Sequence, residues 1–111
     1  MSLERIFKAL VSLGLSQNDA RVYIFLALKG SKKLKSIFDI LQINKQQIVH
    51  SLENLQNKGI IVEDLDKKKT FSALAFEEAL ESLIKNKKKQ AQTMQETKET
   101  LLSSWKRTTE D

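Results

Sequence analysis

Residues 30–61, GSKKLKSIFDILQINKQQIVHSLENLQNKGII, predict two helices joined by a short turn and followed by a strand. The first helix is expected over 35–41, and its apolar spacing predicts burial of four side chains, Leu34, Ile37, Phe38 and Leu41. The second is expected over 45–58, because Asn44 is a favourable N-cap and Gly59 a favourable stop. Gln47 stands at the reciprocal capping position, and Ile43 can pack on Ile48 as a hydrophobic staple.

The first turn of this second helix carries no acidic residue. Helix N-termini favour Asp or Glu, because the dipole and the unpaired amides attract negative charge. Here the turn holds Lys45, Gln46 and Gln47 instead. Such an end suits an external anion and the edges of bases, so the helix has the character of a recognition helix.

Further elements on both sides complete a winged helix-turn-helix pattern. A helix is expected over 2–13, and a second begins at Ser16, which can form a capping box with Asp19. That second helix is apolar almost all round from Ala20 to Leu28, which predicts a central position in the core. Strands at 60–63 and 70–73 form a hairpin. The fold class is therefore mainly α with a small β-hairpin, followed by a long helix.

The last helix is expected over about 76–107, with no Gly or Pro to interrupt it. Its first apolar stripe, from Phe76 to Ile84, can pack on the domain. Further on, six positions alternate by four and three, the period of a coiled coil, and two of them are lysine: Lys87, Ala91, Met94, Lys98, Leu101 and Trp105. We expect residues 1–75 to form the DNA-binding domain and 76–111 a dimerisation helix that uses Ala91, Met94, Leu101 and Trp105.

Composition excludes several classes of function. The 111 residues contain no cysteine and one histidine, so neither a disulfide framework nor a Cys/His metal site is expected. There is no Gly-rich phosphate loop and no converging pair of acids, which argues against an enzyme or a bound cofactor. No apolar run approaches the length of a membrane span and no signal peptide is visible, so a cytoplasmic protein is expected.

The net charge of +5 lies entirely in the first two thirds of the chain. Residues 1–73 contain 12 Lys and Arg against 7 Asp and Glu, whereas residues 74–111 contain 7 of each. A basic excess confined to one folded unit favours a nucleic-acid partner. The alternative is a general lysine bias with no bearing on function.

The stretch LGLSQNDARVY (residues 13–23) leads into the predicted second helix. It is similar to the pattern LGL-[ST]-x-x-E-A-R-x-Y and so resembles the opening of the DNA-binding domain of the TrmB family of archaeal transcriptional regulators. The resemblance continues through Ile37 and Ile43, the stretch Leu52-x-x-Leu55-x-x-Lys58-Gly59-Ile60-Ile61, Phe71-x-Ala73 and Glu77-Glu78-Ala79-Leu80. It covers about residues 10 to 84 without a gap.

The resemblance implies a winged-helix regulator that binds double-stranded DNA. Three departures accompany it. The recognition helix has no proline at its N-cap, and Lys45 replaces the usual arginine, which removes bidentate reading of guanine there. Only one helix stands where larger members carry a ligand-binding domain, so a small-molecule effector is not expected.

Three groups of residues are expected to contact duplex DNA. In the major groove, Gln46 and Gln47 can each make a two-pronged contact to adenine, while His50 and Asn54 extend the polar ridge and Lys45 meets phosphate. Backbone contacts are expected from Lys35 and Ser36 at the start of the preceding helix, and from Lys67, Lys68 and Lys69 on the wing. Each group can alternatively be a solvated polar surface. Arg21 is expected to tether its helix rather than touch DNA, and Lys85 to Lys89 to form a solvated charge run.

A second class of function is also open. The chain can instead be a winged-helix interaction module, an adaptor in a transcription or remodelling assembly, whose wing and long helix bind protein. Binding to random duplex at low salt separates the two, because the adaptor should show little of it.

Overall fold

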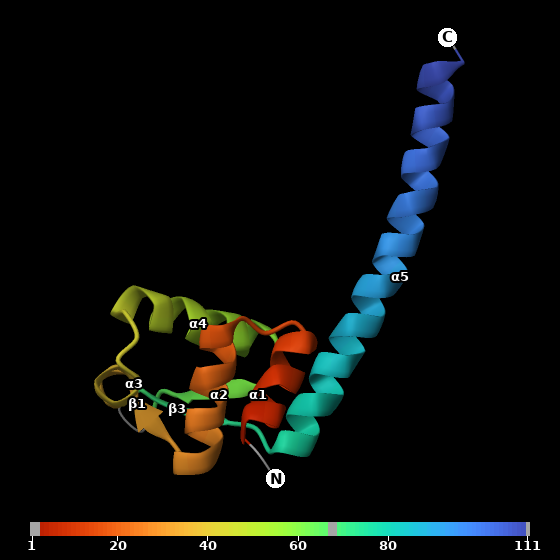
Figure 1. Ribbon diagram of the computed structural model, residues 1–111. Coiled ribbons are helices and arrows are strands. Elements are labelled where there is room, and N and C mark those ends of the chain that lie inside the picture. The colour runs from red at the N-terminus through yellow and green to blue at the C-terminus, as the bar shows by residue number, and fades with distance from the viewer. Residues whose placement is uncertain (1–2, 67–68, 111) are drawn as a thin grey trace.

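A computed structural model describes residues 3–66 and 69–110 and confirms the winged helix-turn-helix fold with a long C-terminal helix (Figure 1). The elements in chain order are α1 Leu3–Ser12, α2 Gln17–Lys29, β1 Lys32–Lys33, α3 Leu34–Leu41, α4 Lys45–Asn57, β2 Ile61–Asp64, β3 Thr70–Ala73 and α5 Phe76–Thr109. The expected wing lysines Lys67 and Lys68 lie outside the described residues. None of the described helices is long and apolar enough to cross a membrane.

The small sheet has three strands rather than the predicted two. β3 lies in the middle, with β2 antiparallel on one side and β1 antiparallel on the other. In β1, Lys32 pairs with Phe71 and Lys33 with Thr70. Two consecutive lysines carry no alternating apolar pattern, so no local signal in the sequence marks this strand. Lys32 and Lys33 therefore tie the start of α3 to the wing.

The core is built around α2, as its continuous apolar run predicts. Val22, Tyr23 and Leu26 are almost completely buried. The other elements also contribute buried side chains, among them Leu10 of α1, Ile37 of α3, Ile48, Leu52 and Leu55 of α4, Ile61 of β2 and Leu83 of α5. α2 lies between the other helices and the sheet. The apolar face of α4 packs toward α2, and the polar face of α4 is therefore directed to solvent.

Helix α3 buries less than expected. Ile37 is fully buried and Leu34 and Leu41 are half-buried, but Phe38 is 41% exposed, so its predicted core position is wrong. A helix of only two turns buries one narrow face, and Phe38 lies at the edge of that face. The turn that follows uses Gln42 in the left-handed region (φ 57°), where its side chain donates a hydrogen bond to the Asp39 carbonyl at 2.7 Å.

Helix α5 leaves the domain after its first three turns. Ala79 and Leu83 are buried against the domain and Leu80 is half-buried, whereas Phe76 and Ile84, predicted in the same stripe, are exposed. Every described residue from Lys87 onward is exposed. The helix accounts for the molecule's elongated shape of 60 × 31 × 25 Å (Figure 1).

Candidate nucleic-acid interface

The N-terminal end of α4 is open to solvent. The Asn44 side chain caps it by accepting a hydrogen bond from the Gln46 amide at 2.8 Å. Within the described ranges, the Gln47 side chain makes no return bond to Asn44, so the predicted reciprocal cap does not form. Lys45, Gln46 and Gln47 are all exposed, and the first turn contains no acid. Both amide side chains are therefore available to an external partner.

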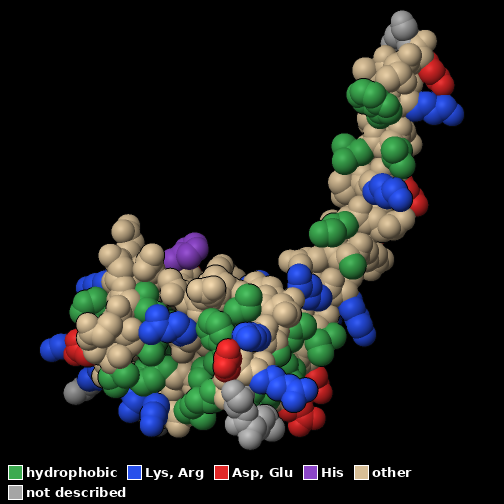
Figure 2. Space-filling view, viewed as in Figure 1, with side chains coloured by type: hydrophobic (Ala, Val, Ile, Leu, Met, Phe, Trp, Pro, Cys, Tyr) green, Lys and Arg blue, Asp and Glu red, His purple; other side chains and the backbone are tan. Residues whose placement is uncertain are grey.

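The two faces of α4 divide as predicted over its first two turns. Ile48, Ser51, Leu52 and Leu55 face the core, and Ile43 just before the helix is also buried. Gln47 and His50 are exposed on the outer face, and Lys and Arg side chains are spread over the domain around it (Figure 2). Val49 lies beside them and is also exposed. A polar ridge of the kind used for base reading thus exists at this end of the helix.

Asn54 lies at the third turn of the same helical face. It is half-buried, and its Nδ2 donates a hydrogen bond to Oδ2 of Asp19 at 3.4 Å. Asn54 thus links α4 to the N-terminus of α2, and its predicted contact in the groove stays a prediction.

The wing carries one described lysine of the predicted three. Lys69 is exposed, with a positive φ of 56° at the start of β3. A hollow of about 290 Å³ between α4 and the sheet is lined by Lys69 together with Glu53 and Glu63. Acidic and basic groups are thus not separated at the base of the wing, and a backbone contact by Lys69 requires its ammonium to point outward.

The start of α3 places two further candidates on the surface. Lys35 is exposed and Ser36 half-buried in the first turn, which has no acidic residue. The N-cap Lys33 provides no side-chain cap, so the first amides of α3 receive no such bond. Within the described residues, no cluster of acidic, histidine or cysteine side chains could hold a metal ion.

Comparison with known proteins assigns the family. Residues 10–77 match the model of the sugar-specific transcriptional regulator TrmB, more than half of the chain. The chain belongs to the TrmB family. A comparison with curated protein sequences finds no match.

Two solved structures are similar to this TrmB-family chain. TrmBL2, an archaeal chromatin protein described as showing a novel mode of DNA binding, matches with a TM-score of 0.75 and 19% identity over 94% of this chain. The chain spans 40% of the length of that protein. A MarR-like transcriptional regulator from Thermotoga maritima matches with a TM-score of 0.49 and 19% identity, over 94% of this chain and 96% of its own. At this identity the likeness to TrmBL2 shows the fold.

In the TrmB-like stretch of residues 13–23, the side chains of Ser16, Asp19 and Arg21 form hydrogen bonds that shape the fold. Asp19 closes a capping box with Ser16: the Ser16 hydroxyl accepts from the Asp19 amide at 3.0 Å, and Asp19 accepts from the Ser16 amide at 3.3 Å. Arg21 donates to the Leu41 carbonyl at 3.0 Å, which confirms the predicted tether and ties α2 to the end of α3. Because Leu41 precedes the turn into α4, this bond helps to set the angle between the two helices.

The sequence predicted Asp19 as a capping residue but did not indicate its burial or its contact with α4. It is almost completely buried, and it joins the capping box of α2 to Asn54 of α4. Its second oxygen, Oδ1, is buried without a hydrogen-bond partner in the described part of the chain. Since an unpaired buried oxygen costs about 1–3 kcal/mol, the packing around Asp19 must offset that loss. A buried acid in a capping box gives no separate signal in sequence.

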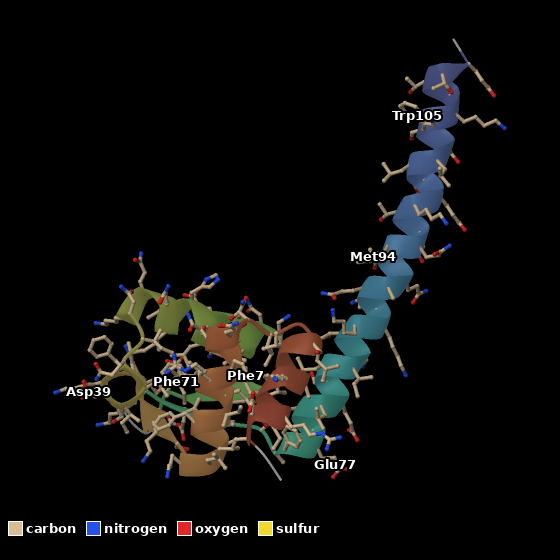
Figure 3. The ribbon with its side chains drawn as sticks, in the orientation of Figure 1. Phe7, Asp39, Phe71, Glu77, Met94 and Trp105 are labelled. Atoms are coloured by element: carbon tan, nitrogen blue, oxygen red, sulfur yellow. The ribbon has the colours of Figure 1, made fainter. Side chains whose placement is uncertain are left out.

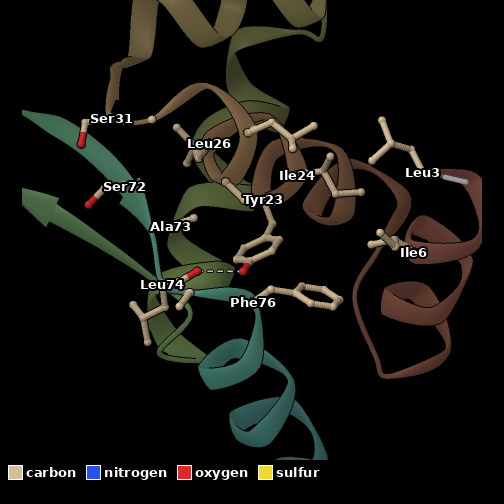
Figure 4. A pocket seen from close by; sticks show the side chains of 14 residues that line it. Leu3, Ile6, Tyr23, Ile24, Leu26, Ser31, Ser72, Ala73, Leu74 and Phe76 are labelled. Atoms are coloured by element: carbon tan, nitrogen blue, oxygen red, sulfur yellow. Dashed lines mark hydrogen bonds between the residues drawn. The ribbon is translucent and has the colours of Figure 1, made fainter. Parts of the chain in front are cut away.

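Tyr23 connects the core to the start of α5. Its hydroxyl donates to the Leu74 carbonyl at 2.8 Å, beside a hollow of about 500 Å³ between α1, α2 and the end of β3 (Figure 4). Burial disfavours the phenolate, so the pKa of Tyr23 is raised above its ordinary value of 10.0. The residue is the chain's one tyrosine, which makes this shift measurable without interference.

We expect the tyrosinate absorbance of the native protein to appear at higher pH than that of the urea-unfolded chain. The unfolded phenol ionises first, so the contribution of Tyr23 to stability is complete below about pH 10 and is lost as pH rises above it. Tyr23→Phe should cost about 1 kcal/mol at neutral pH through loss of the hydrogen bond. Because the Tyr23→Phe variant has no phenol at this position, its free energy of unfolding should fall less than that of wild type above about pH 10. Identical native and unfolded titrations would contradict the burial argument.

Proposed function

We propose that this chain is a transcriptional regulator that binds double-stranded DNA in a sequence-specific manner, with the N-terminal half of α4 in the major groove. The observation that carries the proposal is the solvent-exposed, acid-free mouth of α4 with its one cation and two amide side chains. Membership of the TrmB family supports it. The shared fold with TrmBL2, a chromatin protein with a described mode of DNA binding, adds further support.

The exposed side chains in the first two turns of α4 have defined roles in this proposal. Gln46 and Gln47 offer the paired donor and acceptor that match adenine N6 and N7, and His50 lies one turn further along the same face. Val49 can contact a thymine methyl group. Lys45, at the helix mouth, meets a phosphate and fixes the register without reading sequence.

The surrounding cations hold the duplex backbone. Lys35 and Ser36 lie in the first turn of α3, where a helix-turn-helix protein crosses the backbone. Lys69 contributes from the wing, together with Lys67 and Lys68 if the wing tip follows the backbone as the sequence predicts. These contacts carry charge but no base preference.

The long helix is proposed to pair two copies. Residues 1–75 act as the DNA-binding domain, and residues 76–111 supply the pairing surface, with Ala91, Met94, Leu101 and Trp105 along one seam. Two copies present two α4 helices, so the preferred site contains two related half-sites.

A protein-interaction module is the second candidate. It is favoured by the hollow of about 500 Å³ beside Tyr23, whose rim carries the exposed side chains Leu3, Leu28 and Phe76. In that case the domain binds a partner protein through this apolar face. Absence of duplex binding at low salt would favour this candidate over the regulator.

Gln47→Ala combined with His50→Ala is expected to relax the choice of sequence while leaving the salt dependence of binding almost unchanged. Each good base contact contributes about 1–3 kcal/mol of discrimination, whereas neither side chain carries the charge that neutralises phosphate. The measurement is selection from a random duplex library, followed by binding to the selected and a scrambled site at several salt concentrations.

The matched control is Gln92→Ala with Gln95→Ala, which removes two exposed amides from α5 instead. This control should keep wild-type selectivity. If both pairs of substitutions leave selectivity intact, or if wild type selects no sequence, base reading by α4 is refuted.

A further inference from the structure

One face of the free part of α5 forms a continuous surface. A hollow of about 630 Å³ is lined by Met94, Leu101, Leu102 and Trp105 among others, and a second of about 730 Å³ lies between α5 and the end of α4. The two share Thr93 and Met94, so they run into each other. Met94 and Trp105 lie on the same side of the helix (Figure 3).

The two ends of this surface differ in chemistry. The upper end exposes four large apolar side chains: Met94 at 69%, Leu101 at 62%, Leu102 at 57% and Trp105 at 67%. The lower end is polar and cationic, with Lys58 and Lys89 between the amides of Asn57 and Gln90.

We propose that a second copy of the chain lays its α5 along this surface in the antiparallel direction, with Met94 opposite the partner's Trp105. This inference rests on the pairing of two copies proposed above and adds its direction and register. In this register Lys98 lies opposite the partner's Leu101, and Ala91 opposite the partner's Thr108.

Charge argues against the parallel arrangement. A parallel pair in register places each seam residue against itself, so Lys98 would meet the partner's Lys98 at the centre of the interface. Two ammonium groups in that position repel each other and lose solvation. In the antiparallel pair, the stem of Lys98 lies along a leucine while its ammonium reaches water at the edge.

The shape of the lower end leads to the same direction. Asn57 and Lys58 of α4 stand beside the seam at Gln90, so the space there is bounded by the molecule's own domain. A parallel partner would bring its domain into that space. An antiparallel partner brings only the end of its helix.

The end of an antiparallel partner helix also matches the charge of the lower end. The register sets the partner's Glu110, the C-cap of α5, opposite Lys89. The helix carbonyls at that end carry partial negative charge and favour a nearby cation. Lys106 and Arg107 follow Trp105 on the outer side of the helix and do not line the surface.

The antiparallel register also sets the spacing of the two domains. At a rise of about 1.5 Å per residue, the two copies of Leu83, where α5 is still buried on its own domain, lie about 50 Å apart along the helices. A parallel pair would instead hold them side by side. The direction therefore decides how far apart two half-sites can lie.

Disulfide cross-linking tests the direction, because the chain contains no cysteine of its own. We expect Met94→Cys protein mixed with Trp105→Cys protein to form a disulfide-linked pair under mild oxidation, while each variant alone links poorly. Ala91→Cys mixed with Thr108→Cys should behave in the same way and leaves Trp105 intact. Gln92→Cys, outside the seam, reports random collisions.

The possible outcomes separate the direction from the pairing itself. Efficient linking of Met94→Cys alone would establish a parallel pair and overturn the inference while keeping the dimer. Light scattering on the wild-type chain gives the second test. If it shows only monomer at the concentrations used for cross-linking, both the antiparallel direction and the pairing of two copies are refuted. Neither measurement contains DNA, so duplex binding by α4 is tested separately.

Discussion

Leu55→Ala is expected to lower the free energy of unfolding by about 2–5 kcal/mol, the usual cost of truncating a fully buried leucine. Leu55 has no exposed surface and lies on the inner face of α4. A domain of this size has a total stability of only about 5–15 kcal/mol. The substitution should therefore remove a large part of this stability. If the wild-type stability is near about 5 kcal/mol, the variant domain should be partly unfolded at about 37 °C.

Urea unfolding followed by circular dichroism measures this loss. Leu28→Ala is the matched control, because Leu28 is also a helical leucine but is 60% exposed, and its truncation should cost well under about 1 kcal/mol. A loss at Leu55 no larger than at Leu28 would mean that α4 does not pack on α2 as described. Leu55→Ala should also weaken binding to every duplex alike, since it releases the whole helix.

The second large effect is the salt dependence of DNA binding. If a pair of chains contacts about 6–10 phosphates, affinity for duplex should fall by roughly 10³–10⁵ between 50 and 200 mM salt. The expected contacts come from Lys45, Lys35 and Lys69, each of which is exposed. A fluorescence-anisotropy titration at several salt concentrations gives the slope.

Charge removal tests which lysines produce the slope. Lys35→Ala with Lys69→Ala should weaken all sequences alike and reduce the slope by about 0.9 for each phosphate that is no longer neutralised. Lys8→Ala, a control on α1 whose exposed ammonium pairs with Glu4 at 3.2 Å, should leave the slope unchanged. A slope near zero for the wild-type chain would contradict the regulator and favour the interaction module.

Elements fixed by local chemistry were predictable from sequence. The cap of α2 by Ser16 and Asp19, the start of α4 after Asn44 and the long α5 all depend on residues within one or two turns of each other. Tyr23, Val22 and Leu26 were expected in the core because no polar face interrupts that part of α2. The tether made by Arg21 was also expected, although its acceptor, the Leu41 carbonyl, was not.

Two features that the sequence did not show depend on contacts between distant segments. β1 exists because Lys32 and Lys33 pair with β3, the second strand of the wing. No local pattern in the sequence marks that pairing. Asn54 was placed on the outer face because a helical wheel treats α4 as evenly exposed along its length. The N-terminus of α2 covers its third turn, and only the packed structure shows where that cover begins.

For the candidate interface, the sequence predicted a helix whose N-terminal end is exposed in the structure. Gln46, Gln47 and His50 lie on the surface, but their contacts with bases stay predictions. The electrostatics of the wing were less accessible, because the sequence does not show that Glu53 of α4 and Glu63 of β2 lie beside Lys69. The sequence gives the charge of each side chain, whereas the fold decides which charged side chains lie close together.

The central position of β3 has a mechanical consequence. Its two neighbours hold it on both edges, and only Leu74 and Ala75 separate it from α5. Leu74 is itself fixed, because its amide donates to the Ile60 carbonyl at 2.9 Å and its carbonyl accepts from Tyr23. The wing and the start of α5 are therefore tied to the core through the same residue, Leu74. A substitution that removes either hydrogen bond at Leu74 should loosen both of them together.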